Sequence, residues 1–287
     1  MTGPAVVGLG GGHGLAVTLS AVRRYSTDIT AVVSVADDGG SSGRIRKDFG
    51  LPAPGDIRRC LAALADDPRG AWPRAFGLRF QSGDVEGHAL GNLVLAALVD
   101  TTGSFVGAIE EAGRLLRCRG RVYPATTGAV VLTADTAAGQ VVGQTAVEDH
   151  FGAIIQVGID PPDAGCPPQV VGALRGADQI VLGPGSLFTS VLAVTAVPEI
   201  RRALLAKPPV FVCNLKASKE TPGFTVADHV GALERHGITP AVVLADPQEI
   251  ELGTMPKSCP VASRRLATST GWAHDPELLG AALYELL

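Results

Sequence analysis

The sequence predicts an α/β protein: a doubly wound, mostly parallel sheet with helices on both faces and a small antiparallel insertion. Short, fully apolar runs recur along the 287 residues, and amphipathic helical patterns lie between or beside them. A run without alternation indicates a strand that is covered on both faces, and strands that alternate with helices indicate a parallel sheet. Because no internal repeat divides the chain, we expect one domain over residues 1–287.

Five apolar runs are the expected strands, and each ends in glycine, aspartate or asparagine. They are "AVVGLGGG" (5–12), "ITAVVSVADD" (29–38, with the strand itself over 29–36), "QIVLGPGS" (179–186), "PVFVCNLK" (209–216) and "AVVLADP" (241–247). Apolar residues at helical spacing predict helices that begin near residues 15, 55, 89 and 226. Strands and helices therefore alternate as a parallel sheet requires.

Residues 128–159 depart from this pattern. Helical spacing fades there, and "DTAAGQ" indicates a turn between two alternating strands. We expect an antiparallel insertion within the α/β domain, followed by a loop over 160–169. Residues 247–270 are the least regular segment, and no element is expected in them.

Composition places the chain among soluble globular proteins, with 46% hydrophobic and 18% charged residues. A net charge of −4 gives no basic footprint for nucleic acid. Five scattered cysteines, none in a C-x-x-C spacing, argue against a disulfide framework or a structural zinc site and indicate a reducing compartment. The first residues lack a basic segment followed by an apolar one. We therefore expect no signal peptide, no membrane span and a cytoplasmic location.

The first glycine loop, "GLGGGHGL" at 8–15, follows the first strand and opens a helix. Glycines let the backbone approach a ligand, and a helix N-terminus offers free N–H groups to an anion. The loop favours phosphate or nucleotide binding by Gly10, Gly11, Gly12, His13 and Gly14. It is neither the G-x-G-x-x-G fingerprint nor a P-loop, which argues against a dinucleotide-dependent dehydrogenase. A glycine turn that serves only strand-to-helix packing is the alternative.

The acidic loop "VADDGGSSGR", at 35–44, places Asp37 and Asp38 at a strand end, before Gly39 and Ser41. Paired carboxylates suit hydroxyl groups, a divalent ion or a base, and the small residues after them offer N–H groups to an anion. A solvated acidic turn is the alternative.

The same loop formally contains G-x-S-x-G, which is the pattern of a nucleophile elbow around Ser41. His88, His229 or His274 would then be the base. We disfavour this reading because the pattern is short, and because we expect no immediate helix after Ser42.

A second glycine loop, "VLGPGSLFTS" at 181–190, repeats the strand–glycine–helix pattern. Gly183, Gly185 and Ser186 would form a second rim for an anion or a base, and Asn214 ends the next strand. Asp56 in "PAPGDIRR" is either a helix N-cap or a site residue, and Asn92 in "GHALGN" is either a helix-end amide or a site residue. Because the carboxyl ends of parallel strands share one edge, we expect these motifs to form one site.

Six motifs occur in a fixed order: "GGGHGL", "ADDGGSSGRIR", "APGDIRRCLAALAD", "GHALGN", "GPGSLFTS" and, near the end, "HDPE". In this order they resemble the gluconeogenesis-factor (YvcK-like) family, which belongs to the superfamily of the 2-phospho-L-lactate transferase CofD. The resemblance runs from residue 5 to about 246 and is weaker in the tail. Several long motifs in register are far more specific than one glycine loop.

The resemblance implies a Rossmann-like fold and a nucleotide ligand. In the YvcK-like branch this is UDP-N-acetylglucosamine, with NAD also a candidate, and in the transferase it is a guanine nucleotide. The residues carried over are Gly10–Gly14, Asp37, Asp38, Gly39, Ser41, Asp56, Asn92 and Gly183–Ser186.

The chain departs from the family pattern at three places. His13 stands where the family has threonine, and "NLKASKETPGF" replaces a longer "NLMTQPGETDGF"-like stretch. Ala273 stands where an arginine usually precedes "HD"; that arginine would be a natural diphosphate partner. Residues 247–270 also lack a tyrosine that would stack on a base.

Two functions follow from the resemblance. The first is a nucleotide-sugar-binding regulatory protein that links carbon metabolism to cell-wall synthesis and cell shape. The second is a transferase of 2-phospho-L-lactate from a nucleotide diphosphate to a deazaflavin, with Asp37 or Asp56 as the catalytic candidate and holding Mg²⁺. The enzyme would need an aromatic-lined slot, and aromatic residues are only 5% of the chain. The oligomeric state, including a homodimer, stays open.

Overall fold

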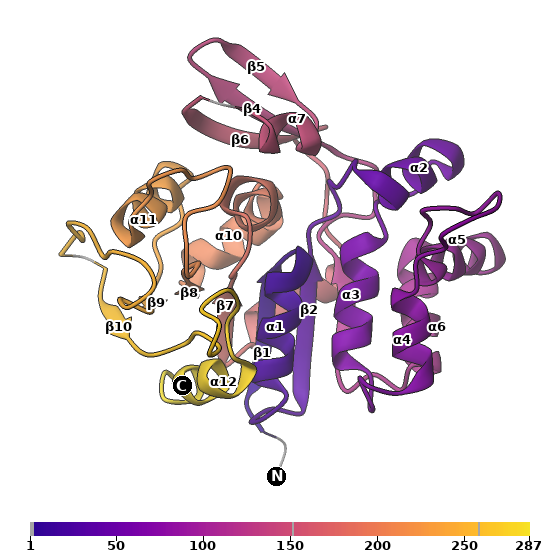
Figure 1. Ribbon diagram of the computed structural model, residues 1–287, viewed down its shortest axis with the longest axis horizontal. Helices are drawn as coiled ribbons and strands as arrows, with labels where there is room; N and C mark the ends of the chain where they lie inside the picture. The colour runs from indigo at the N-terminus through magenta and orange to yellow at the C-terminus, as the bar shows by residue number, and fades with distance from the viewer. Residues whose placement is uncertain (1–2, 151, 258) are drawn as a thin grey trace.

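The computed structural model describes residues 3–150, 152–257 and 259–287. Its centre is a seven-stranded sheet in the order β10-β9-β8-β7-β1-β2-β3, and neighbouring strands in it run parallel (Figure 1). The strands are β1 (Ala5–Gly10), β2 (Asp28–Val33), β3 (Arg121–Pro124), β7 (Gln179–Leu182), β8 (Val210–Val212), β9 (Val242–Ala245) and β10 (Val261–Ser263).

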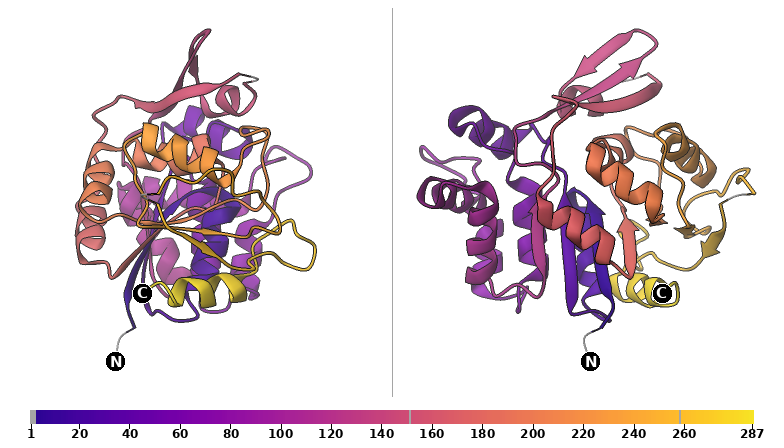
Figure 2. Two further views of the ribbon diagram at one scale, coloured as in Figure 1. Left: turned by 90° about the vertical axis from the view of Figure 1, so that its left-hand side faces the viewer. Right: turned by 180° about the vertical axis from the view of Figure 1, so that it is seen from behind.

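Helices cover both faces of this sheet, as expected for a doubly wound fold (Figure 2). One face carries α1 (Gly12–Val22), α3 (Gly55–Leu64) and α12 (Pro276–Tyr284), and the other carries α8 (Pro168–Gly176) and α10 (Pro198–Ala206). The remaining helices are α2 (Gly40–Phe49), α4 (Ala71–Gly77), α5 (Leu90–Thr102), α6 (Phe105–Leu115), α7 (Gln144–Glu148), the π-helix η1 (Leu187–Leu192), α9 (Ala193–Thr195) and α11 (Val226–Arg235).

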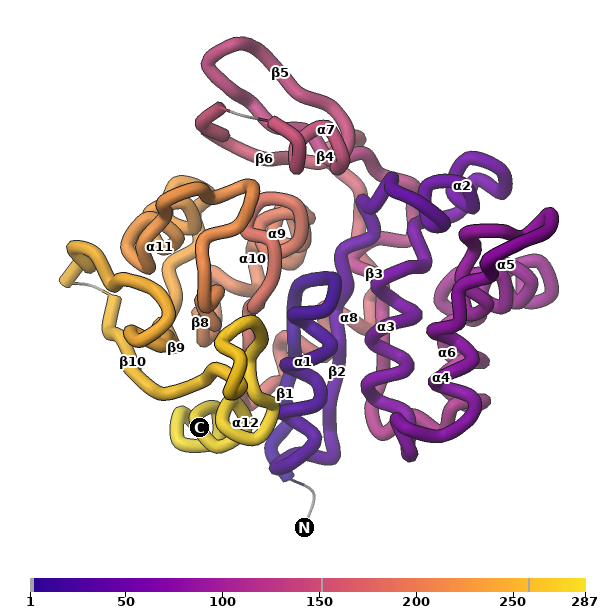
Figure 3. The backbone as a smooth tube through the Cα atoms, in the orientation of Figure 1, coloured from indigo at the N-terminus to yellow at the C-terminus, as the bar shows by residue number. Residues whose placement is uncertain are grey.

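The antiparallel insertion is confirmed. β4 (Val131–Thr136) pairs with β5 (Gly139–Val142) and with β6 (Ile154–Asp160), all antiparallel. The backbone trace in Figure 3 shows this small sheet and α7 above the carboxyl ends of the main strands. The predicted fold class is therefore correct, whereas one domain over residues 1–287 stays a prediction.

Three details differ from the sequence expectations. β2 ends at Val33 rather than at residue 36, because both neighbouring strands end beside it, at Gly10 and Pro124. Residues 40–49 form α2, although no immediate helix was expected; its buried Ile45 packs inward despite the poor helix formers in its first turn. The irregular segment 247–270 contributes the edge strand β10.

The helices of the described residues include none that is both long and apolar enough to cross a membrane.

Candidate functional site

The two glycine loops meet where the strand order reverses. β1 lies between β2, which follows it in the chain, and β7, which comes much later. A Cβ on Gly14 would lie 2.1 Å from the carbonyl oxygen of Pro184, so the backbones of the two loops are in direct contact. Thr18 of α1 also donates a hydrogen bond to the Gly183 carbonyl, at 2.8 Å. This reversal point is where open α/β sheets bind ligands.

Two adjoining pockets lie at this point and share His13, Gly14, Gly185 and Ser186. One, which we call the Trp272 pocket, has a volume of about 340 Å³. The other, the Asp56 pocket, has a volume of about 400 Å³. A ligand with two unlike halves fits such an arrangement, because each half meets a different wall.

The first glycine loop leaves a helix N-terminus open to the pockets. Gly12 needs its φ of +63°, which glycine adopts without cost, and its N–H donates to the Asp56 carboxylate at 2.5 Å. The other Asp56 oxygen accepts from Arg59, also at 2.5 Å. The next two N–H groups, of His13 and Gly14, lie in the first turn of α1, where a helix supplies no carbonyl partner. They are the open anion-binding groups of this loop.

Asp56 is therefore not the N-cap of α3, which begins one residue earlier with Pro54 at its cap, and it lines the Asp56 pocket. Asp37 lines the same pocket. Burial raises the pKa of Asp37, and the nearby Asp56 carboxylate adds to that rise, whereas the N–H of Gly39 stabilises its ionised form at 3.0 Å. The two catalytic candidates thus face one polar pocket.

Asp38 has a different environment from its neighbour. Its carboxylate accepts hydrogen bonds from the N–H of Gln144 (2.9 Å) and from the N–H and hydroxyl of Thr145 (3.0 and 2.7 Å). These groups begin α7, so Asp38 joins the acidic loop to the insertion. Asp38 does not line either pocket.

Ser41 and Asn92 lie behind the site in a buried network. Asn92 donates to the Ser41 hydroxyl at 3.0 Å and accepts from Arg58 at 3.1 Å. Burial lowers the pKa of Arg58 to about 10. Ser41 is 3% exposed and lies 3.2 Å from Nδ1 of His88. Within the described residues no carboxylate partners His88, and a buried hydroxyl cannot meet a substrate, so the contacts do not support a nucleophile elbow.

The second glycine loop is already occupied by the protein's own side chains. Asn214 accepts from the N–H of Gly185 at 3.0 Å and donates to its carbonyl at 2.9 Å. Glu220, which is 8% exposed, accepts from the N–H of Phe188 at 3.0 Å and from the Thr189 hydroxyl. Burial raises the pKa of Glu220. The start of η1 is thus filled by an internal carboxylate, which the sequence expectation of a second anion rim did not include.

Several residues that line the pockets were missed by sequence reasoning, Gln144 and Glu148 of α7 among them, and Trp272 is the most exposed of the large hydrophobic ones. It is 80% exposed at the rim of the Trp272 pocket, and the Lys216 ammonium lies 4.4 Å from its ring centroid. His274 forms the wall beside it; burial lowers its pKa to about 4, and its Nε2 lies 3.1 Å from the Cys213 carbonyl. The signal was available in "GWAHDPE", where a tryptophan stands in a glycine-flanked loop next to a family motif.

Asp37 and Asp56 do not form a metal site by themselves. No cluster of three or more His, Cys, Asp or Glu side chains with metal-binding geometry occurs among the residues that the structure describes. Mg²⁺ is commonly held by one or two carboxylates together with substrate phosphates. These two side chains therefore fit a Mg²⁺ ion that arrives with a diphosphate.

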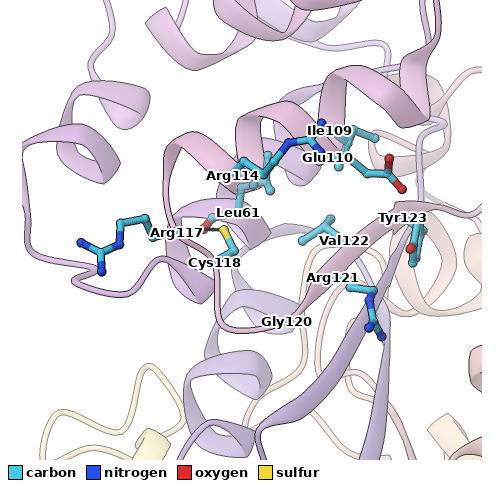
Figure 4. Close-up of a pocket in the computed structure, with 11 residues that line it drawn as sticks. Leu61, Ile109, Glu110, Arg114, Arg117, Cys118, Gly120, Arg121, Val122 and Tyr123 are labelled. Atoms are coloured by element: carbon cyan, nitrogen blue, oxygen red, sulfur yellow. Dashed lines mark hydrogen bonds between the residues drawn. The ribbon is translucent and has the colours of Figure 1, made fainter.

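A further pocket, of about 460 Å³, lies at the opposite edge of the sheet (Figure 4). It is formed by Leu61 of α3, Ile109 of α6 and the start of β3 at Arg121. Because it lies by the amino-terminal end of a parallel strand, it is distant from the glycine loops.

Comparison with known proteins identifies the family. The family model described as "2-phospho-L-lactate transferase CofD" matches residues 6–277. The chain belongs to the CofD family. It is 43% identical over 239 residues to the "Gluconeogenesis factor" of Bacillus subtilis, covering 81% of this chain and 75% of that protein. The resemblance stated from the motifs is thereby confirmed.

Two further relatives are called "Putative gluconeogenesis factor". The one from Nostoc sp. is 43% identical over 81% of this chain and 52% of its own length. The one from Deinococcus radiodurans is 40% identical over 99% of this chain and 66% of its own length. The CofD-family chain thus spans between half and two thirds of these two relatives.

A crystal structure of a UPF0052 family member from Bacillus halodurans has the same fold. It matches with a TM-score of 0.91 and 33% identity, over 99% of both chains.

Proposed function

We propose that this CofD-family protein binds a nucleotide-sugar, UDP-N-acetylglucosamine, across the two adjoining pockets. The observation that carries the proposal is the open N-terminus of α1 at the junction of a polar pocket and a pocket with an aromatic rim. A diphosphate would bind there to the N–H groups of His13 and Gly14, with a base on one side and a sugar on the other.

The base belongs in the Trp272 pocket. Trp272 presents a ring face at the rim, and stacking on a base is worth about 1–3 kcal/mol. Lys216 would add a positive charge near the phosphates. This charge matters because Ala273 replaces the arginine that the family usually has before "HD". The Ser186 hydroxyl and the Asn214 amide supply polar groups to the same wall.

The sugar belongs in the Asp56 pocket. Asp37, Asp56, Glu148 and Gln144 line it, and carboxylates and amides are good partners for hydroxyl groups. Among the described residues that line this pocket, none is aliphatic beyond glycine and none has a carbocyclic aromatic ring. A deazaflavin acceptor would require an apolar, aromatic-lined surface. Its absence from the Asp56 pocket favours a sugar ligand over the transferase reaction.

The transferase remains the second candidate, because the family model is that of the transferase and because Asp37 and Asp56 face one pocket. In that reaction Mg²⁺ would neutralise the diphosphate, and the two carboxylates would hold the ion.

We propose a regulatory role in the cytoplasm. The relatives' name connects them to gluconeogenesis, and UDP-N-acetylglucosamine is a building block of the cell wall. A protein that binds this ligand would link carbon metabolism to cell-wall synthesis and cell shape.

Calorimetric titration with UDP-N-acetylglucosamine, with Mg²⁺ present, tests the proposal. We expect saturable binding in the micromolar range. Trp272→Ala should weaken it about tenfold, because a stacking contact is lost. Trp72→Ala is the matched control, since Trp72 is 54% exposed on α4 and lies outside both pockets. Absence of heat with this ligand, together with binding of a guanine nucleotide, would favour the transferase.

A further inference from the structure

The antiparallel insertion supplies one wall of the Asp56 pocket. Gln144 and Glu148 are four residues apart on α7 and therefore lie on the same side of that helix. Both line the Asp56 pocket, together with Asp37 and Asp56. In Figure 1 the insertion stands over the carboxyl ends of β1 and β7, which brings α7 to the pocket from above.

Loops that follow strands of the main sheet contact α7 near both of its ends. At the start, the Asp38 carboxylate accepts from Gln144 and Thr145, and Gly143 approaches it so closely that a Cβ there would lie 2.7 Å from Oδ2. Beyond the end, Asp149 forms an ion pair with Lys219. A helix of five residues is not stable by itself, so the hydrogen bonds to Asp38 at its start determine where Gln144 and Glu148 lie, and the exposed Asp149–Lys219 pair adds little.

The chemistry of the pocket specifies what α7 can recognise. Three carboxylates, of Asp37, Asp56 and Glu148, face it, so a second anionic group would be repelled. Arg59, the cation among its lining residues, is already paired with Asp56. Carboxylate and amide oxygens instead accept hydrogen bonds from an uncharged group that is rich in hydroxyls.

We propose that Glu148 and Gln144 of the insertion are specificity-determining residues that recognise the hydroxyl groups of the non-nucleotide half of the ligand. Asp38 is a positioning residue that acts through α7 and does not touch the ligand. This inference rests on the proposed function, and it assigns the insertion a role in ligand selection.

The experiment measures the dissociation constants of UDP and of UDP-N-acetylglucosamine. The ratio of the first to the second reports how much the sugar half adds to binding, and a larger ratio means a stronger preference for the nucleotide-sugar. We expect Glu148→Gln to reduce this ratio about tenfold, since a hydrogen bond to a charged group is lost. Because UDP has a terminal phosphate and more negative charge than UDP-N-acetylglucosamine, both dissociation constants are measured at high ionic strength, which screens the repulsion that Glu148→Gln removes. Glu234→Gln, on the exposed side of α11, is the matched control and should leave the ratio unchanged.

The role of Asp38 has its own readout. Asp38→Asn should reduce the ratio while leaving the dissociation constant of UDP within about twofold, and combining it with Glu148→Gln should add little, because both act on one contact. If Asp38→Asn instead weakens UDP itself, Asp38 touches the nucleotide and its positioning role is wrong.

The outcomes separate this inference from the proposed function. A wild-type protein that prefers UDP-N-acetylglucosamine, together with a Glu148→Gln variant that keeps the full preference, overturns the inference alone. Equal binding of both ligands by the wild type also overturns it, while nucleotide binding stands. Failure of the wild type to bind either ligand overturns the proposed function, and this inference with it.

Discussion

The two glycine loops have similar sequences, and each binds a carboxylate from elsewhere in the chain, but the two carboxylates occupy different places. After β1, the Asp56 carboxylate accepts from the N–H of Gly12, and the N–H groups of His13 and Gly14, which line the pockets, have no hydrogen-bond partner among the described residues. After β7, Asn214 holds Gly185, and Glu220 fills the start of η1. A strand–glycine–helix pattern thus builds a helix N-terminus, but distant side chains decide whether an anion can bind there.

This comparison indicates which loop the phosphates of the ligand would bind. Phosphates would find the open N–H groups of His13 and Gly14 at the first loop, next to the N–H of Gly12 that Asp56 holds, whereas at the second loop Glu220 holds the N–H of Phe188. The second loop therefore suits the uncharged part of a ligand.

The largest expected effect is at the contact between the loops. Gly14→Ala would place a methyl group 2.1 Å from the Pro184 carbonyl oxygen, so the backbone must move. We expect the free energy of unfolding to fall by more than about 3 kcal/mol, and ligand binding to be lost. Urea unfolding measures the first quantity.

Gly12→Ala is its control, because a Cβ there meets nothing within 4 Å and only the strain of a φ of +63° remains. That strain is worth about 1–2 kcal/mol. Equal losses in the two variants would mean that the contact between the loops is not essential.

The next effect concerns His274, beside the second loop. Its pKa is lowered by burial from 6.5 to about 4, so the unfolded chain binds more protons between these two values. The stability that neutral His274 contributes is present above pH 6.5 and is lost as the pH falls through 4. We expect the wild type to lose about 3 kcal/mol more than His274→Gln between pH 7.5 and pH 4.

Denaturant unfolding at a series of pH values measures this difference. His13, in the first loop, gives the comparison: partial burial and the nearby Arg59 also lower its pKa, but less than that of His274, so His13→Gln should diverge from the wild-type curve in the same direction and by less. Parallel curves for His274→Gln and the wild type would show that His274 does not titrate in this range.

Glu220 tests the filled state of the second loop. Glu220→Ala leaves the N–H of Phe188 and the Thr189 hydroxyl without their acceptor, which should cost about 2 kcal/mol. Because a carboxylate is what is missing, added formate should restore part of the melting temperature.

Glu277→Ala is the control for the formate experiment, since Glu277 lies in the first turn of α12 and is exposed. Equal recovery in both variants would show a general salt effect instead of an anion at η1.

The smallest expected effect is at the surface of the insertion. Lys219 and Asp149 are both more than half exposed, and such pairs contribute little in water. We expect Lys219→Ala to leave the melting temperature unchanged within error. A clear loss would mean that this pair, and not Asp38 alone, holds α7.

The sequence was sufficient for the five central strands because they are buried on both faces, whereas the edge strands β3 and β10 were not predicted. "AVVGLG" is apolar throughout and "QIVL" is apolar after Gln179, and each leads into the glycines of a ligand-side loop. Parallel pairing then brings those loops to one edge, so their proximity could be predicted without coordinates. α2 and β10 could not be predicted, because tertiary packing outweighs the weak local preferences of residues 40–43 and 261–263.

The roles within the site depended on contacts between distant residues. Asp37 and Asp38 are adjacent and chemically identical, yet one lines a pocket and the other binds α7, more than one hundred residues later. Glu220 and Trp272 lie in or beside segments that the motifs marked, but nothing local showed that Glu220 would bind the start of η1 or that Trp272 would line a pocket. Such assignments require the positions of the partners, which local patterns do not contain.

A crystal structure of the protein with UDP-N-acetylglucosamine would test the central claim most directly. We predict diphosphate oxygens within hydrogen-bond distance of the N–H groups of His13 and Gly14, with Glu220 still bound to Phe188. Phosphates on the N–H groups of η1, with Glu220 displaced, would contradict the distinction between the two loops.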